Sequence, residues 1–321
     1  MNHKHLYHIF IFLALMIDTS PILAQVSFQE HEDRVDVLMG GKLFTTFHYG
    51  KEWDKPFLHP IIRLDGTIVT RGYPLEPLEG DSQDHPFHRG LWYAHGDING
   101  VDFWREATEE RGNYPLPLGT IEVQTKPQTS TRQGRGTLSA AGHLITHEGQ
   151  DIGTFLEQFT FSQEEENQII DIQISILANQ GKSLNMGDTE EGCLGFRFRE
   201  EFRQDRGAVL SNAKGQRGTE KIWGKRANWV DYSTTVDGNK TGVAFFDHPD
   251  NPNHPTYWHA RGYGLCAANP FGIRHFLNDP NRDGSLTIPP YEQLIFRYRV
   301  LIHPGDSEEA GIEELYQKYL K

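Results

Sequence analysis

Apolar and polar residues alternate with a period of two along most of this chain. In residues 170–176 four isoleucines alternate with Asp, Gln and Ser, and residues 296–302 repeat the pattern with Phe, Tyr, Val and Ile. Shorter stretches of the same kind lie at 121–124 and 155–161. Such alternation indicates strands with one buried face, and many strands separated by Gly and Pro turns are typical of packed sheets. The pattern predicts an all-β protein, built as a large twisted antiparallel β-sandwich.

Turn and cap signals add two hairpins and one helix. Gly-Gly at 40–41 and Asp-Gly at 65–66 each separate two β-prone stretches, within residues 34–48 and 61–70. Both dipeptides are common hairpin turns. A C-terminal helix is expected from Ser307 to about Leu320, because acids follow its cap, lysines end it and one face is apolar.

The first residues have the features of a secretory signal. Lys4 gives a basic start, 9–17 is an unbroken apolar run, and Ala24 closes a cleavage region. The run is far below the ~20 residues that a membrane-spanning helix needs, although an uncleaved anchor remains the alternative. We therefore expect a signal at residues 1–24, a single β-sandwich domain at 25–321, and a secreted or periplasmic protein.

The charge composition of the chain limits the binding partners that can be expected. The chain has 31 Lys and Arg against 44 Asp and Glu, a net charge of −13. Nucleic acids and anionic membranes select basic patches, so neither is an expected partner, whereas local Arg and Lys can still bind an anionic small molecule. The two cysteines, Cys193 and Cys266, can pair or remain buried thiols.

Residues 84–106 carry the densest set of reactive side chains. His85, His88 and His95 lie there among aspartates, arginines and two tryptophans. Imidazole titrates near neutrality and suits proton transfer, and it is also a common metal ligand. The alternative is that these histidines donate to loop carbonyls and brace the segment. No fixed-spacing metal motif is present, so no cofactor is expected, with a divalent metal at these three histidines kept open.

Three further clusters follow, and each has a structural alternative. The acids of 188–191 could act as acid, base or cation ligands, or form a solvated turn. The segment 223–232 could bind anions and stack on sugars, or be an edge strand. The Pro-rich segment 246–264 brings more histidines and aromatics. We expect the loops 84–102 and 247–263 to meet in one pocket.

These motifs resemble a family known as PmoA-like, a domain of unknown function. The resemblance rests on Asp84–Trp92, His95–Trp104, Trp223–Arg226 and Phe246–Gly264, and extends over roughly Phe44 to His303. It implies a secreted carbohydrate-active protein of polysaccharide-degrading bacteria, without assigned catalytic residues. By analogy it implies a supersandwich-like fold, as in mutarotase-like proteins and polysaccharide lyases. The family label refers to a membrane methane monooxygenase subunit. This sequence contradicts that reading, because it has no apolar spanning segment after the signal.

We expect a carbon–oxygen lyase that acts on acidic, uronic-acid-containing oligosaccharides by elimination. A base removes the C5 proton, and Arg or Lys neutralises the carboxylate so that enolate-like charge can form. The residues expected to be catalytic are His88 as base, Tyr263 as acid, His85 and His248. The residues expected to bind the substrate are Arg89, Trp92, His95, Asp97, Lys225, Arg226, Trp229, His259 and Arg261.

Three alternatives stay open. A glycoside hydrolase would pair Asp97 with Glu190 or Glu191. A mutarotase-like epimerase would also use acid–base chemistry on a sugar. A binding module without catalysis would stack sugars on three tryptophans: Trp92, Trp229 and Trp258.

Overall fold

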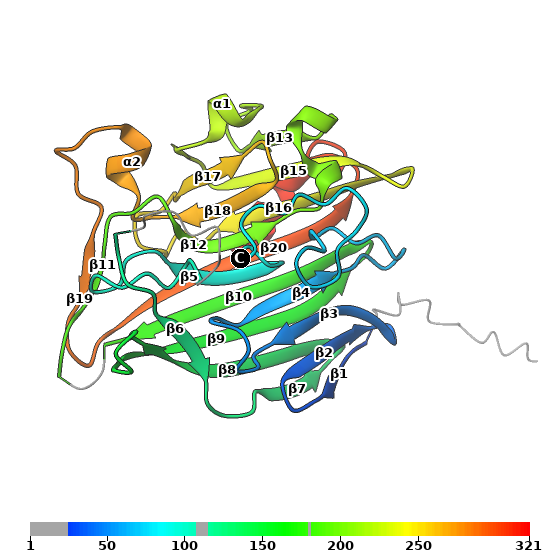
Figure 1. Cartoon of the computed structure of the whole chain (residues 1–321). Coiled ribbons are helices and arrows are strands. Elements are labelled where there is room, and N and C mark those ends of the chain that lie inside the picture. Colours follow the sequence, from blue (N-terminus) through cyan, green and yellow to red (C-terminus); the bar gives the residue numbers. More distant parts are fainter. Residues whose placement is uncertain (1–24, 107–114, 179–180) are drawn as a thin grey trace, which may run out of the picture.

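The computed structural model describes residues 25–106, 115–178 and 181–321. Within these ranges, the strands form two nine-stranded antiparallel sheets and a small two-stranded sheet (Figure 1). The prediction of a large antiparallel β-sandwich with a C-terminal helix is confirmed. The expected signal at residues 1–24 lies outside the described residues.

The first sheet has the strand order β1-β2-β3-β4-β5-β12-β18-β17-β14. Its strands are β1 (Val26–Glu30), β2 (Arg34–Met39), β3 (Lys42–His48), β4 (Phe57–Ile61), β5 (Leu91–His95), β12 (Gly192–Arg197), β18 (Leu265–Asn269), β17 (Tyr257–Arg261) and β14 (Lys225–Arg226). Segments far apart in the sequence thus become neighbours, since β5 pairs with β12 and β12 with β18.

The second sheet has the strand order β13-β15-β16-β20-β10-β9-β8-β6, and β7 also pairs with β8. Its strands are β13 (Val209–Asn212), β15 (Trp229–Val236), β16 (Asn239–Asp247), β20 (Gln293–Pro304), β10 (Asn167–Leu177), β9 (Asp151–Glu164), β8 (Arg135–Ile145), β6 (Thr120–Val123) and β7 (Gln128–Arg132). The small sheet pairs β11 (Leu184–Met186) with β19 (Leu286–Ile288).

The core lies between the two large sheets. Tyr93 of β5 packs against Phe155 of β9 and Phe296 of β20, with ring centroids 5.6 and 5.5 Å apart. Successive side chains of a strand point to opposite faces, so Trp92 points away from this core. Trp92 is nonetheless buried, because loops cover the outer face of the first sheet there. This outer face holds most of the candidate chemistry.

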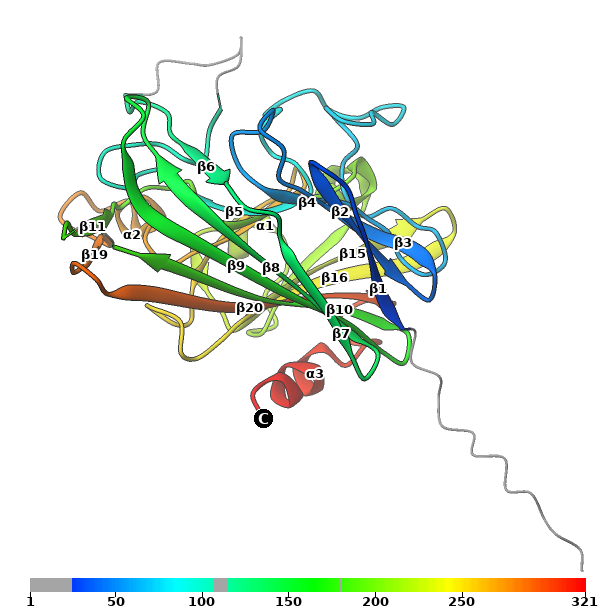
Figure 2. The ribbon, with the colours of Figure 1, turned by 90° about the horizontal axis from the view of Figure 1, so that it is seen from below.

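The C-terminal helix α3 (Ile312–Tyr319) packs against the outer face of the second sheet (Figure 2). Ile312 and Tyr316 are buried there with Trp229 and Phe246 in a second, smaller apolar cluster. The remaining helices are short and were not expected from the sequence: α1 (Thr219–Ile222), α2 (Ile273–Leu277), and the 3₁₀ turns η1 (Glu200–Phe202) and η2 (Gln204–Arg206).

Helix α3 begins at Ile312, later than the predicted start at Ser307. The signals read as a helix start instead build a separate turn, in which Asp306 Oδ1 accepts the backbone N–H groups of Glu308 and Glu309, each at 3.0 Å. Gly311 then adopts a left-handed conformation with φ +61° and separates this turn from the helix.

Removing this cap is expected to cost about 1 kcal/mol, the usual effect of losing a capping carboxylate. We expect Asp306→Ala to lower the free energy of unfolding by that amount in a urea titration. Asp250→Ala is a suitable control, because its carboxylate is exposed and accepts no backbone hydrogen bond in the described residues. Equal stability of both variants would show that the turn contributes nothing.

One predicted hairpin is confirmed and the other is only partly formed. Strands β2 and β3 pair around Gly40 and Gly41, both with positive φ. At 61–70 the chain turns, with Arg63 N–H donating to Thr67 O at 2.8 Å, but a single bridge replaces a ladder. The reason is that Thr70 pairs with Phe198 instead.

Two further sequence questions are settled by the structure. Cys193 and Cys266 are buried free thiols, so they do not form a disulfide. Among the described residues, no helix has the length and apolar character needed to cross a membrane.

Candidate functional site

Four positions form one row across the outer face of the first sheet. Trp92 lies opposite Gly195, Gly195 opposite Ala267, and Ala267 opposite His259. The two central residues are small, and a Cβ on Gly195 would come within 2.5 Å of Trp92 and 2.7 Å of Trp104. Glycine is therefore required for these indoles to lie close to the sheet.

The loop that carries the first cluster is held by the buried guanidinium of Arg71. Its Nη1 donates to Asp84 O at 2.7 Å, and its Nη2 donates to His85 O at 2.9 Å and His88 O at 3.2 Å. His85 has φ +45°, a left-handed conformation that costs roughly 1–3 kcal/mol unless its surroundings impose it. Arg71 supplies that constraint and so sets the position of the His85 side chain.

Asp84 and His85 form a hydrogen-bonded pair at the surface. His85 Nδ1 lies 2.5 Å from Asp84 Oδ2, and Arg197 Nη2 donates to Asp84 Oδ1 at 2.9 Å. Burial raises the pKa of Asp84, but the bond to His85 and the Arg197 charge outweigh it and hold the pKa well below its usual range. Asp84 is thus ionised, and it selects the tautomer with the proton on Nδ1 and the lone pair on Nε2. The His85 side chain is 41% exposed.

His88, in contrast, is enclosed by aromatic rings. It stacks on His85 on one side and on Trp92 on the other, with centroids 4.9 and 5.2 Å away. Its Nε2 already accepts the indole N–H of Trp104 at 3.1 Å, and burial keeps its pKa well below the ordinary value. His88 is therefore a neutral, packed imidazole that supports His85 from below.

Tyr263 lies on the exposed side of His85. The two rings are nearly parallel, with an interplanar angle of 7° and centroids 6.1 Å apart, and the Arg197 guanidinium lies 4.8 Å from the phenol ring. Burial raises the pKa of Tyr263 to about 12, although Arg197 lowers it in part. The phenol stays protonated at neutral pH and can donate.

A second group of charges lies at the β17 side of the same face. Arg261 pairs with the Glu190 carboxylate and donates from Nε to His259 Nε2 at 2.9 Å. His259 Nδ1 lies 3.0 Å from Glu190 O, and burial lowers the His259 pKa, so this imidazole is neutral. The Arg261 guanidinium also lies 4.7 Å from the Trp223 ring. Arg261 ends β17 and Tyr263 follows it by two residues, so the two groups are neighbours along the chain.

Arg89 is turned away from this site. Its guanidinium donates to both Glu106 oxygens, at 2.8 and 2.5 Å, and Lys55 Nζ lies 2.5 Å from the same carboxylate. It also lies over the Trp53 ring at 4.6 Å. All three charged side chains are buried, so Arg89 is part of a buried ion cluster.

His95 and Asp97 serve the local backbone. His95 is fully buried, and its Nε2 lies 2.8 Å from Gly187 O. Asp97 Oδ1 accepts the N–H of Gly100 at 2.8 Å and closes a turn. These contacts follow the bracing alternative that the sequence left open.

The two basic residues of β14, Lys225 and Arg226, have different surroundings. Arg226 donates to the carbonyls of Asn253, His254 and Pro255 and so holds that loop, while Lys225 is exposed at the sheet edge. Trp258 points into the core and donates to Ala227 O, so its face is not available for stacking.

His248 and Trp229 lie on the other side of the sandwich. Trp229 Nε1 donates to Glu313 Oε2 of α3 at 2.7 Å, and His248 packs on Tyr319 with centroids 5.4 Å apart. The 247–263 loop thus joins the two outer faces. Only its end at His259, Arg261 and Tyr263 shares a face with His85, so the expected common pocket does not include His248.

The three histidines proposed as an alternative metal site do not converge. His85 and His88 stack face to face at an interplanar angle of 2°, an arrangement that prevents both lone pairs from pointing at one ion. In the part of the chain that the structure describes, no group of three His, Cys, Asp or Glu residues is placed to hold a metal.

One structural residue of the site, Arg71, was missed by sequence reasoning, and the role of a second, Arg197, was not foreseen. Arg71 and Arg197 are fully buried, lie 13 and 113 positions from residue 84 in the sequence, and together position the Asp84–His85 pair. Nothing in the local pattern of either arginine indicates this role. Their signal is tertiary, namely buried guanidinium groups that need carboxylate and carbonyl partners.

Comparison with solved structures finds distant similarity over most of the chain. A galactose mutarotase-like protein from Lactobacillus casei ATCC 334 is 10% identical, covers 87% of this chain and 100% of its own, and has a TM-score of 0.37. A galactose mutarotase related enzyme from Lactobacillus acidophilus is also 10% identical, with coverages of 87% and 97% and a TM-score of 0.37. A putative aldose 1-epimerase from Escherichia coli K12 is 10% identical, covers 87% of this chain and 99% of its own, and has a TM-score of 0.36.

These proteins are named as mutarotase-like proteins and an aldose epimerase, and this finding overturns the prediction of a carbon–oxygen lyase acting by elimination on uronides. At this identity the likeness concerns the fold alone. A search of curated proteins found no match.

The sequence comparison identifies the family. The matching family model is described as "Family of unknown function (DUF6807)" and spans residues 34–317. The resemblance to the PmoA-like family is therefore corrected, because the motifs that suggested it all lie within this match. The chain belongs to the family of unknown function DUF6807.

Proposed function

We propose that the protein binds an aldose at the outer face of the first sheet and interconverts its two anomers by proton transfer. The observation that carries this proposal is the Asp84–His85 pair stacked against Tyr263. It places an exposed imidazole with a free Nε2 lone pair next to a phenol that keeps its proton. A base beside an acid is the requirement for opening a cyclic hemiacetal.

The reaction balances with these two groups. His85 Nε2 takes the proton of the anomeric O1–H, the C1–O5 bond breaks, and Tyr263 gives its proton to O5. The open-chain aldehyde rotates about C1–C2 and closes again from the other face of C1. On closure, the protonated His85 returns a proton to O1 and the O5 hydroxyl returns its proton to Tyr263. No cofactor or co-reactant is therefore consumed. Positioned acid–base groups of this kind typically contribute about 10²–10⁴-fold in rate.

The surrounding charges favour a neutral sugar. Arg261 is paired with Glu190, and Arg105 is paired with Glu191 at 3.1 Å, so each of these two pairs is neutral. The Arg261 and Glu190 side chains are 35% and 29% exposed, which leaves a donor and an acceptor for sugar hydroxyl groups. Trp223 beneath Arg261 adds an aromatic wall.

Anomer exchange can be measured directly. In two-dimensional exchange NMR on D-galactose, D-glucose and D-xylose, catalytic amounts of protein should accelerate the transfer of magnetisation between the α and β anomeric protons of at least one sugar. Binding without exchange would make the protein a sugar-binding module. If none of the three sugars binds or exchanges, the proposal is wrong.

We also propose that the protein acts outside the cytoplasm on the reducing-end sugar of an oligosaccharide, after export on residues 1–24. The basic start, the apolar run and Ala24 support the export. N-terminal sequencing of the protein from its native host should give a chain that begins at Gln25. A cytoplasmic protein that retains Met1 would contradict export.

A further inference from the structure

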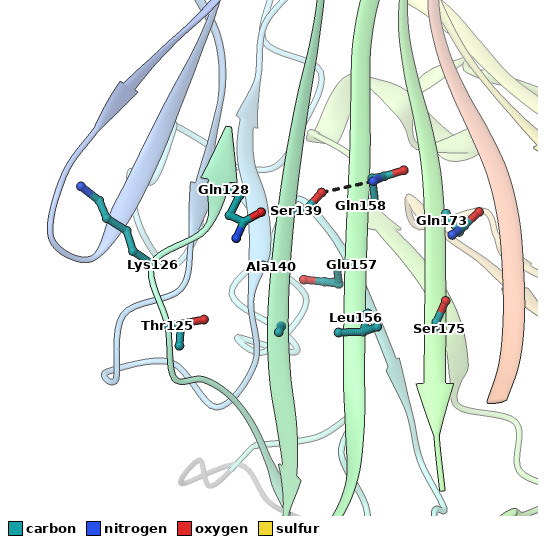
Figure 3. A pocket seen from close by; sticks show the side chains of 11 residues that line it. Thr125, Lys126, Gln128, Ser139, Ala140, Leu156, Glu157, Gln158, Gln173 and Ser175 are labelled. Carbon is teal, nitrogen blue, oxygen red and sulfur yellow. Dashed lines mark hydrogen bonds between the residues drawn. The ribbon is translucent and has the colours of Figure 1, made fainter. Parts of the chain in front are cut away.

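A cavity lies on the second sheet, on the opposite side of the sandwich from the candidate site. It has a volume of about 300 Å³ and is lined by β8, β9, β10 and the segment between β6 and β7 (Figure 3). Ser139, Gln158 and Gln173 form one row along its wall, because Gln158 lies opposite both other residues. Lys126 stands at the rim.

The lining side chains leave most of their hydrogen-bonding capacity free. A single hydrogen bond joins them, from Gln158 Nε2 to Ser139 Oγ at 3.2 Å (Figure 3). Within the described residues, the side chains of Gln128, Gln173 and Ser175 have no protein partner. The cavity therefore presents amides and hydroxyl groups, which both donate and accept.

The cavity carries no free charge. The ammonium of Lys126 is 2.9 Å from the Glu30 carboxylate, which neutralises it. Glu157 adds no charge to the cavity, because it lies on the opposite face of β9 from Gln158, in line with the core residues Phe155 and Phe159. Its side chain is 3% exposed, and burial raises its pKa well above the ordinary value, so the carboxyl is neutral.

We propose that this cavity is a second sugar-binding site that takes one neutral pyranose ring. The free amides and hydroxyl groups match the alternating donors and acceptors of ring hydroxyls, while Leu156 and Ala141 offer an apolar patch to the C–H face. Ligand pockets commonly have roughly 300–1,000 Å³, so this cavity suits a single ring at the lower end of that range. The site is independent of the proposed anomer exchange, because it uses no residue of the first sheet.

Hydrogen-exchange mass spectrometry on the full chain can locate the binding. D-galactose, D-glucose and D-xylose are the probes, each titrated until protection saturates. At least one should slow amide exchange in peptides that cover β8 to β10, with an apparent affinity that His85→Ala leaves unchanged. Protection confined to 84–90 and 257–264 would support the first site alone and overturn this proposal.

Variants of the cavity test its chemistry. Gln158→Ala combined with Gln173→Ala should weaken the β8–β10 protection at least tenfold, because two amides are lost. Gln293→Ala, an exposed glutamine of the same sheet outside the cavity, should have no effect. An unchanged affinity in the double variant would refute the proposed contacts.

Discussion

Replacing His85 by Ala is expected to lower the rate of anomer exchange by about 10²–10⁴-fold, the usual contribution of a positioned acid or base. The variant loses an imidazole that is 41% exposed and has a carboxylate partner. Tyr263→Phe should cause a similar loss, since the ring and its stacking remain but the donated proton is gone. The measurement is the exchange rate between α and β anomeric protons at saturating sugar, together with the sugar affinity.

Matched controls separate chemistry from damage to the fold. His147 and Tyr291 are exposed and lie outside the site, so His147→Ala and Tyr291→Phe should exchange anomers at the wild-type rate. Asp84→Asn tests positioning, because an amide no longer selects the Nδ1–H tautomer of His85; its exchange rate should fall and its pH profile should change shape. Full activity in His85→Ala would remove His85 from the mechanism.

Replacing Glu106 by Gln is expected to lower the free energy of unfolding by about 3–5 kcal/mol, the cost of breaking a buried ion pair from one side. Glu106 neutralises both Lys55 and Arg89, and the three side chains are at most 8% exposed. Without the carboxylate, two buried cations face each other, and Arg89 already lowers the Lys55 pKa in addition to burial. Urea unfolding followed by tryptophan fluorescence measures the change.

The pH dependence of this cluster has a definite sign. Burial raises the Glu106 pKa, but Lys55 and Arg89 outweigh it, and the folded-state pKa lies below the ordinary value of 4.5. The carboxylate therefore contributes its full stabilisation above pH 4.5, and the contribution is lost as pH falls through the folded-state pKa. Glu308→Gln breaks an exposed pair with Arg217 and should leave stability unchanged. An equally small effect of Glu106→Gln would show that the buried cations relax into solvent.

The local sequence pattern predicted part of the candidate site. The sequence showed that residues 84–106 and 246–264 concentrate polar and aromatic groups on loops, and the structure brings His85 and Tyr263 from these two loops into contact. It did not show that His88 would be the enclosed imidazole and His85 the exposed one. That difference arises because Trp92 and Trp104 cover His88, while His85 lies between His88 and Tyr263 with its side chain 41% exposed.

Period-two alternation by itself determined the strands β6, β9, β10 and β20, since a strand with one buried face needs no partner to reveal its spacing. Apolar spacing likewise determined α3, although Gly311 delayed its start. Only the tertiary structure decided which strands pair and which polar groups meet. Arg197 and Asp84 are joined across 113 positions of sequence, and His248 is carried to the second sheet while Arg261 of the same segment stays on the first. Ion pairing and burial depend on the closure of both sheets around one core, and no local spacing encodes them.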